Sequence, residues 1–238
     1  MSGRVWLVGA GPGDPELLTV AADRALRSAR VVVYDRPSMG PIVALAPRAR
    51  LVCVGRGGLD LPQPEVNALL VSLAREGDVV RLKSGDPFVA SRGGEEAVAL
   101  REAGIDVRVI PGVSAALAAP AAAGIPLMLR RLSVTATFVD GNDDPEHAAP
   151  PDWPALAGLG GTLVILTGRG RIRRTAAALI AGGRSPDTPI AAISAAGRPE
   201  QRVLRGTLAA LPAPLPPPVT FVVGPAAALD LCTSPTAS

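Results

Sequence analysis

The residues of this chain best suited to binding and orienting a small ligand are Asp86, Arg92 and Glu95, which lie close together in one segment. The segment closes an apolar run with the small-residue turn Ser84-Gly85-Asp86-Pro87 and then opens a predicted helix near Arg92 and Glu95. Such a turn exposes backbone amides, glycine lets a ligand approach the main chain, and Asp86 can accept hydrogen bonds from an amino or ribose group. Asp86-Pro87 also fits a plain turn with an Asx-type bond, so both interpretations stay open.

Two further glycine-containing turns accompany this segment. Gly9-Ala-Gly-Pro-Gly13 follows an apolar run, but its alternating glycines and its prolines do not match the dinucleotide-binding pattern, which needs free backbone donors. A tight connection between strand and helix is the structural alternative for this turn. The third turn is Pro111-Gly-Val-Ser-Ala115, in which Ser114 is equally suited to cap a helix or to contact a ligand.

These turns are positioned by alternating strands and helices. Short apolar runs recur in the first half of the chain, separated by segments with helical periodicity, and this alternation favours a parallel sheet covered on both faces. The expected strands are 5–8, 31–34, 51–54, 79–82 and 107–110, and the expected helices follow residue 17 and lie near 40–45, 65–75 and 93–103.

The second half of the chain predicts another α/β lobe. We expect its strands at 133–139, 162–167, 189–193, 201–208 and 219–223. The last two are joined by a short proline-rich link without a helix, which indicates a mixed sheet. The predicted organisation is an N-terminal lobe over 1–112, a linker lining the cleft over 113–130 and a C-terminal lobe over 131–238. An exposed loop is expected near 141–152 and a frayed tail after Leu231.

The three turns, in this order and at these separations, resemble those of the tetrapyrrole methylase family. Within that family the chain is most similar to uroporphyrinogen-III C-methyltransferases, over about Arg4 to Gly224. The resemblance implies S-adenosylmethionine as methyl donor, S-adenosylhomocysteine as product, an anionic tetrapyrrole as substrate, a two-lobed α/β fold and a homodimer. It also assigns residues to the cofactor, namely Pro12, Ser84, Gly85, Asp86, Val89, Ser114, Ala115, Thr167 and Ala196.

The resemblance also implies roles in catalysis and in substrate binding. Asp35 corresponds to a proton acceptor, and Arg92 with Glu95 completes the catalytic set, where Glu95 is favoured by the helix dipole and is expected to orient Arg92. Guanidinium groups pair with carboxylates in a two-point fork, which suits a polycarboxylate substrate. The arginines expected to face that substrate are Arg36, Arg56, Arg92 and Arg130.

The chain departs from the family pattern at several of these positions. Ser84 replaces a glycine, Thr167 a methionine, and Arg56 a lysine that is the proposed proton donor. Arginine keeps its proton near neutrality, so Arg56 supplies charge rather than acid catalysis. Met128 and Leu129 stand where the family commonly has polar residues. Methyl transfer from a sulfonium chiefly requires alignment, which agrees with the single histidine, His147, lying in a predicted loop outside any catalytic set.

Composition and residue patterns argue against nucleic-acid-binding, metal-binding and membrane proteins. The net charge of +3 comes without a basic block interleaved with aromatics, so nucleic acid is not an expected partner. Cys53 and Cys232 form no metal or disulfide pattern, and we expect no metal. No run approaches the roughly 20 apolar residues of a membrane span, and no cleavable signal pattern is visible, so a cytoplasmic protein without membrane association is expected.

The favoured function is methylation of uroporphyrinogen III at two ring positions to give precorrin-2, for sirohaem or cobalamin synthesis. A methyltransferase for a later corrin precursor is the nearest alternative. A regulatory protein that binds the cofactor without turnover, suggested by the departures, is the alternative from another class, and a nicotinamide-dependent oxidoreductase ranks last.

Overall fold

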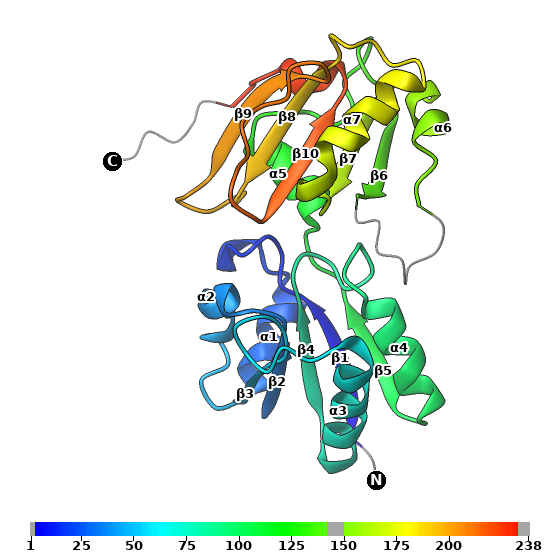
Figure 1. The fold of residues 1–238 in the computed structure, drawn as a ribbon. Coiled ribbons are helices and arrows are strands. Elements are labelled where there is room, and N and C mark those ends of the chain that lie inside the picture. Colours follow the sequence, from blue (N-terminus) through cyan, green and yellow to red (C-terminus); the bar gives the residue numbers. More distant parts are fainter. Residues whose placement is uncertain (1–2, 142–149, 233–238) are drawn as a thin grey trace. The chain divides into compact units, whose positions relative to one another are not determined.

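The computed structural model describes residues 3–141 and 150–232 and divides the chain into two compact units, Met1–Ser114 and Ala115–Ser238. Figure 1 shows that each unit is built on one sheet with helices packed against it. The division falls within the segment 113–130 that was expected to act as a linker. His147, most of the predicted loop 141–152 and the end of the predicted tail lie outside the described residues.

The first sheet is parallel throughout, as the alternation of strands and helices predicts. Its order, β3-β2-β4-β1-β5, places β4 and β1 at its centre. The strands are β1 (Arg4–Gly9), β2 (Val31–Tyr34), β3 (Arg50–Cys53), β4 (Val79–Lys83) and β5 (Asp106–Ile110). The helices are α1 (Val20–Ser28), α2 (Gly40–Val43), α3 (Gln63–Glu76) and α4 (Gly93–Glu102), with 3₁₀ turns at Pro15–Leu17 and Pro37–Met39.

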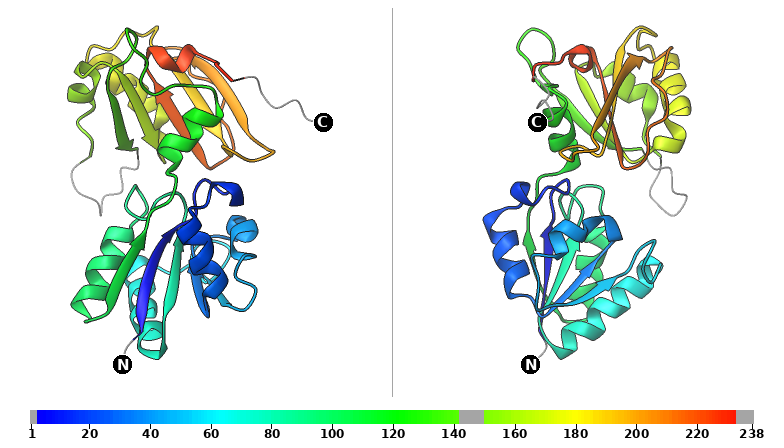
Figure 2. Two further views of the ribbon diagram at one scale, coloured as in Figure 1. Left: turned by 180° about the vertical axis from the view of Figure 1, so that it is seen from behind. Right: turned by 90° about the vertical axis from the view of Figure 1, so that its left-hand side faces the viewer.

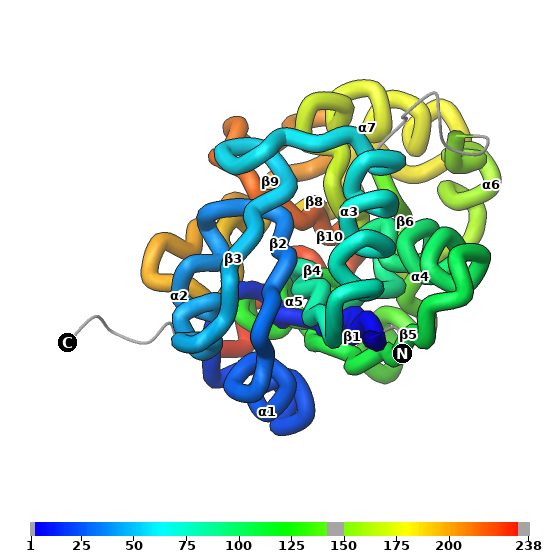
Figure 3. The backbone as a smooth tube through the Cα atoms, turned by 90° about the horizontal axis from the view of Figure 1, so that it is seen from below, coloured from blue at the N-terminus to red at the C-terminus, as the bar shows by residue number. Residues whose placement is uncertain are grey.

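Helices cover both faces of this sheet. Figure 3 shows α1 on one side and α3 and α4 on the other. On the α1 side the core contains Leu26 of the helix and Leu82 of β4, and on the other side it contains Leu70 of α3 and Leu100 of α4. Because side chains alternate along a strand, Arg81 of β4 points to the opposite side from Leu82, toward α3 and α4.

The start of α1 shows how local sequence sets a helix end. Thr19 is the N-cap, and its hydroxyl accepts a hydrogen bond from the backbone N–H of Ala22. Ala22 and Leu26 then form the buried stripe. Leu18 lies before the cap but still packs against this core layer.

The second sheet is mixed, as predicted. Its order is β6-β7-β10-β8-β9, in which β6 and β7 are parallel and the other neighbours are antiparallel. The strands are β6 (Ala136–Asp140), β7 (Thr162–Leu166), β8 (Pro189–Ser194), β9 (Arg202–Thr207) and β10 (Val219–Val223). The helices are α5 (Ala115–Ala122), α6 (Trp153–Gly158) and α7 (Ile172–Ala181), with 3₁₀ turns at Arg169–Arg171 and Pro225–Ala228. As predicted, β9 leads to β10 without a helix.

Helices flank the second sheet on both faces, which the two views of Figure 2 display. One core layer includes Ala157 of α6 and Leu179 of α7, and the other includes Ala119 of α5. The strand predicted to begin at Ser133 begins instead at Ala136. Ser133 is held in a tight turn, because its backbone N–H and C=O both pair with Leu129 at 2.9 Å.

Candidate active site

The three glycine-containing turns meet at one edge of the first sheet. They follow β1, β4 and β5, which are neighbours in a parallel sheet, so their carboxyl ends lie side by side. The carboxyl edge of such a sheet is where open α/β folds bind their ligands. The tertiary structure therefore brings together segments that are as much as 100 residues apart in the sequence, Gly9–Gly13, Ser84–Pro87 and Pro111–Ser114.

Backbone-to-backbone packing holds these turns together. Gly11 and Gly85 exchange two backbone hydrogen bonds, of 3.1 and 2.8 Å. A Cβ atom on Gly9 would lie 2.4 Å from the backbone nitrogen of Gly112, and one on Gly112 would lie 2.3 Å from the carbonyl oxygen of Gly85. Only glycine fits at these contacts without displacing the main chain. The glycines of these turns thus serve close packing between turns, and Gly85 is buried among them.

Asp86 joins two of the turns through its carboxylate. Oδ1 accepts a hydrogen bond of 2.8 Å from the backbone N–H of Phe88, which is the Asx-type turn that the sequence allows. Oδ2 accepts one of 3.1 Å from the backbone N–H of Gly112 in the turn after β5. Asp86 therefore fixes the shape of this edge, and its oxygens retain lone pairs that a ligand can use.

The remaining cofactor candidates of the first unit are near Asp86 in the sequence or lie in the other two turns at this edge. Ser84 is exposed, Pro12 and Val89 are partly buried, and Ser114 is buried. Ala115, the neighbour of Ser114, is the first residue of α5 and belongs to the second unit.

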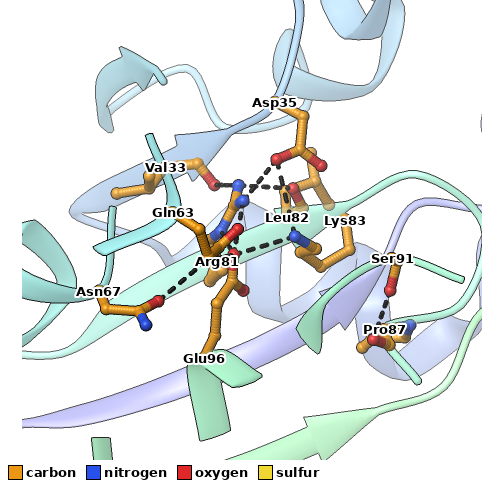
Figure 4. A network of polar contacts seen from close by, with 10 residues as sticks. All are labelled: Val33, Asp35, Gln63, Asn67, Arg81, Leu82, Lys83, Pro87, Ser91 and Glu96. Carbon is orange, nitrogen blue, oxygen red and sulfur yellow. Dashed lines mark hydrogen bonds and ion pairs between the residues drawn. The ribbon is translucent and has the colours of Figure 1, made fainter. Parts of the chain in front are cut away.

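Behind this edge lies a group of charged side chains that we call the buried charge cluster: Asp35, Arg81, Lys83 and Glu96 (Figure 4). Arg81 and Lys83 are on β4, Glu96 is on α4, and Asp35 directly follows β2. Arg81 is paired with Asp35 and, at 2.8 Å, with Glu96. Lys83 Nζ lies 3.0 Å from Glu96 Oε1 and 3.7 Å from Asp35 Oδ1.

A single oxygen of Glu96 accepts the hydrogen bonds that the described residues donate to this side chain. Oε1 accepts from Arg81 Nη2 at 2.8 Å, from Arg81 Nε and Lys83 Nζ, each at 3.0 Å, and from Gln63 Nε2 at 3.3 Å. Gln63 is itself held by Asn67 Oδ1 at 2.9 Å. Glu96 Oε2 has no hydrogen-bond partner among the described residues, although the side chain is fully buried.

The cluster sets the charge of Asp35. Burial by itself would raise the pKa of this carboxyl, but the positive charges of Arg81 and Lys83 outweigh burial and hold its pKa below the usual range. The pKa of Lys83 is lowered, first by burial and then by the neighbouring charge of Arg81. Asp35 is the cluster member that reaches the surface, with a side-chain exposure of 24% against 3% or less for the other three.

The helix expected to carry Arg92 and Glu95 is α4, and it begins one residue after Arg92. Arg92 is its N-cap and adopts the left-handed conformation, with φ of 59°. Glu95 lies in the first turn and is exposed, whereas the next residue, Glu96, is the one that faces the sheet. The acidic residue of this motif that enters an ion-pair network is thus Glu96.

Of the arginines assigned to the substrate, Arg36, Arg56 and Arg130 are exposed, and Arg92 is partly buried. Arg36 and Arg56 follow β2 and β3 in the first unit, and the charge of Arg36 also contributes to lowering the pKa of Asp35. The backbone of Gly55, beside Arg56, approaches that of Asp35 so closely that a Cβ atom there would lie 2.1 Å from the Asp35 carbonyl oxygen. Arg130, in the second unit, is exposed in the turn before β6.

In the second unit the predicted cofactor residues follow β7 and β8. Thr167 adopts a left-handed conformation, with φ of 57°, and its hydroxyl donates to Asp140 Oδ1 or to the Leu166 carbonyl. Ala196 is partly buried and packs against the core layer that includes α5. Each occupies a strand-end turn, but of different strands.

Sequence reasoning missed the roles of Arg81, Lys83 and Glu96. A signal was present, because Val79–Lys83 is a buried strand that nevertheless contains two cations, and Lys83 is the chain's single lysine. Charged residues on a buried strand need oppositely charged or hydrogen-bonding partners. The partner on α4 is evident only once the helix is packed on the sheet.

A cavity of about 470 Å³ lies elsewhere in the first unit, at the amino ends of β1 and β4. Its lining includes Trp6, Arg24 and Asp78 and none of the predicted site residues. Within residues 3–141 and 150–232 no group of three or more His, Cys, Asp or Glu side chains is placed to hold a metal ion. We therefore locate the candidate site from the strand-end turns and not from the cavity.

Comparison with known proteins identifies the family of this chain. The family model described as Tetrapyrrole (Corrin/Porphyrin) Methylases matches residues 4–212. The chain belongs to this family. The match includes both sheets up to β9, so the family covers the three turns and the buried charge cluster alike.

Relatives share both sequence and structure with this methylase. A Methanosarcina barkeri protein named S-adenosyl-L-methionine-dependent uroporphyrinogen III methyltransferase is 46% identical over 212 residues, which are 87% of this chain and 83% of the relative. Siroheme synthase 1 of Klebsiella pneumoniae is also 46% identical, but this chain spans only 49% of its length. A Thermus thermophilus uroporphyrin-III C-methyltransferase, solved with S-adenosylhomocysteine, is 40% identical with a TM-score of 0.83, covering 94% of this chain and 98% of that one.

Proposed function

We propose that this methylase transfers methyl groups from S-adenosylmethionine to two ring positions of uroporphyrinogen III, giving precorrin-2 for sirohaem or cobalamin synthesis. The observation that carries the proposal is the 46% identity to the Methanosarcina barkeri methyltransferase across 83% of that protein. The Thermus thermophilus relative, solved with the demethylated cofactor, supports the choice of methyl donor.

The first unit offers groups that fit such a cofactor. Ser84 presents an exposed hydroxyl that has no hydrogen-bond partner among the described residues, and Asp86 beside it presents a carboxylate already oriented by two backbone N–H groups. The exposed Phe88 and the partly buried Val89 add apolar surface. A nucleoside needs hydrogen-bonding groups next to apolar surface, and this edge provides both.

We assign to the cofactor the residues Pro12, Ser84, Gly85, Asp86, Val89, Ser114 and Ala115. In the second unit, Thr167 and Ala196 keep the same assignment, which rests on the family resemblance. When bound, S-adenosylmethionine supplies a methyl group already activated by its positively charged sulfur. The protein's own task is then to align the reactants and to exclude water.

Charged side chains in both units suit the acceptor. We propose that Asp35 takes the proton that the pyrrole loses, because its carboxylate is kept ionised and reaches the surface. Arg36, Arg56, Arg92 and Arg130 are exposed or half-exposed guanidinium groups that can pair with the carboxylates of a porphyrinogen. Glu95 is proposed to act with Arg92 at the start of α4.

The experiment is to incubate the purified protein with S-adenosylmethionine and enzymatically made uroporphyrinogen III, and to count the methyl groups on the product by mass spectrometry. Two added methyl groups are expected. Transfer only to a later corrin precursor would reassign the substrate. Cofactor binding without transfer to any macrocycle would make the chain a regulatory homologue.

A homodimer in the cytoplasm is a further proposal, and it is supported by the family resemblance alone. Among the described residues no helix has both the length and the apolar character that a bilayer crossing demands. Sedimentation equilibrium of the purified protein measures the oligomeric state directly, and a monomer at micromolar concentration would overturn the dimer.

A further inference from the structure

The buried charge cluster contains two cations and two carboxylates, and its geometry is uneven. Three of its members are buried, and Asp35 alone among the four is partly exposed. Lys83 lies between the carboxylates, 3.0 Å from Glu96 and 3.7 Å from Asp35. Arg81 also contacts both carboxylates. Both cations therefore connect a deeply buried anion to a partly exposed one.

A stabilising role does not explain why these charges are buried together. Taking charges out of water is costly, and replacing a buried ion pair with well-packed apolar residues is often neutral or stabilising. Here the cost is increased because Glu96 Oε2 is buried without a hydrogen-bond partner among the described residues. β4 is the middle strand of the sheet, where apolar side chains at positions 81 and 83 would avoid the cost of burying charge.

The exposed end of the cluster indicates what it does. Asp35 follows β2 at the carboxyl edge of the sheet, where its carboxylate can meet a ligand, while Arg81 and Lys83 hold it from behind. Arg81 Nη1 is additionally within 3.5 Å of the backbone carbonyl of Val33, two residues before Asp35. The cations thus fix both the end of β2 and the side chain that follows it.

We infer that Lys83 and Glu96 are positioning residues for Asp35. Lys83 keeps the carboxylate of Asp35 ionised and oriented. Glu96 holds Lys83 and Arg81 in place and partly neutralises their positive charge. This inference rests on the proposed role of Asp35 in methyl transfer. It gives the single lysine of the chain a function that Arg56, exposed after β3, does not share.

The charges around Asp35 act in opposite directions. Arg81 and Lys83 of β4 and the adjacent Arg36 favour its ionised form, whereas Glu96 of α4 is a second negative charge in the same cluster. When Asp35 accepts a proton, Arg81, Lys83 and Glu96 are left with one net positive charge if Lys83 is protonated. That excess disfavours the protonated acid, so Asp35 readily releases the proton to water and is reset for the second transfer.

The test compares Lys83→Met with Glu96→Gln, because the two changes have opposite electrostatic signs. Lys83→Met removes a cation and is expected to raise the pKa of Asp35 by about 1–3 units, as expected for the loss of an opposite charge nearby. Glu96→Gln removes an anion and is expected to lower it. Arg75→Gln, an exposed arginine on α3, is the matched control for the loss of one positive charge and should leave it unchanged.

Two readouts separate this inference from the proposed function. Carbon-13 NMR of the Asp35 carboxyl in the protein without substrate reports its pKa directly. The pH profile of methyl transfer reports the same group in catalysis, and its acidic limb should move to higher pH in Lys83→Met. If wild type transfers no methyl groups, the proposed function fails, but the NMR titration still decides the positioning role.

The inference is overturned if Asp35 titrates near the ordinary value of about 3.9 in the wild-type protein. It is also overturned if Lys83→Met and Glu96→Gln move the pKa in the same direction, as a purely structural disturbance would. Circular dichroism and thermal unfolding establish that each variant is folded. Should Lys83→Met not fold, the titrations of Glu96→Gln and of the wild-type protein still show in which direction the cluster moves the pKa of Asp35.

Discussion

Gly112 donates its backbone N–H to the carboxylate of Asp86 over 3.1 Å, which ties the turn after β5 to the turn after β4. Because Phe88 donates to the other oxygen of the same carboxylate, one side chain organises two of the three strand-end turns. The edge proposed to bind the cofactor is therefore built by a side chain that is itself a cofactor candidate.

Replacing Asp86 with Ala is expected to weaken cofactor binding strongly. The change leaves the N–H of Gly112 without its acceptor, which costs about 1–3 kcal/mol of stability, and removes a carboxylate from the proposed site. Calorimetry with S-adenosylhomocysteine and urea unfolding measure the two effects. Glu102→Ala, an exposed carboxylate at the end of α4, is the control and should change neither. Unchanged cofactor affinity in Asp86→Ala would remove Asp86 from the site.

Gly9→Ala should destabilise the first unit severely. The added methyl group would lie 2.4 Å from the backbone nitrogen of Gly112 and 2.7 Å from the carbonyl oxygen of Gly85, and neither can move as a flexible side chain would. Overpacking of this kind costs typically about 1–3 kcal/mol, and contacts with main chain place it at or above the upper end.

The matched control is Gly94→Ala. Gly94 lies in the first turn of α4, and a Cβ atom there would have no neighbour within 4 Å. The same substitution in this helical position is expected to stabilise by up to about 1 kcal/mol. Thermal unfolding of both variants checks the contrast, and a Gly9→Ala protein as stable as Gly94→Ala would refute the packing of the turns.

Arg92 is predicted to destabilise the fold through its strained backbone while its side chain serves substrate binding. A left-handed conformation costs a residue with a Cβ atom roughly 1–2 kcal/mol, which glycine does not incur. Arg92→Gly should therefore be more stable than Arg92→Ala, while both lose methyl transfer to uroporphyrinogen III and retain cofactor binding. Unfolding and turnover measured side by side test this. Full turnover in either variant would exclude Arg92 from substrate binding.

Asp35 should make the protein sensitive to acid. Its pKa is lower in the folded protein than in the unfolded chain, since the charges of Arg81 and Lys83 outweigh its burial. The stabilisation is therefore complete above the unfolded pKa of about 3.9 and is lost as the pH falls through the folded pKa.

Asp35→Asn is expected to remove this dependence. The variant should be less stable near neutrality, by up to about 3–5 kcal/mol for breaking a largely buried pair, and its free energy of unfolding should change less below pH 4. Urea unfolding as a function of pH gives both quantities. Asp187→Asn, an exposed carboxylate in the second unit, should follow the wild-type curve. A wild-type pH dependence in Asp35→Asn would contradict the ion pairing.

Much of the fold follows from local patterns in the sequence. Alternating apolar runs and helical segments predict a parallel first sheet and a mixed second sheet. Such a prediction is possible because the burial of a strand or a helix face produces a periodic pattern of apolar residues in the local sequence. The three strand-end turns were also recognisable, since their glycines, prolines and Asp86 are local signals. The family model matches residues 4–212, which include all three turns.

Tertiary packing alone decided which of two adjacent acids is buried. Glu95 and Glu96 are indistinguishable by residue type, and only the docking of α4 on β4 turns Glu96 toward Arg81 and Lys83. It likewise decided that Gly9 and Gly112 touch, although they are distant in sequence. Sequence determines what each short segment can form, whereas contacts between distant segments depend on how those segments pack in three dimensions.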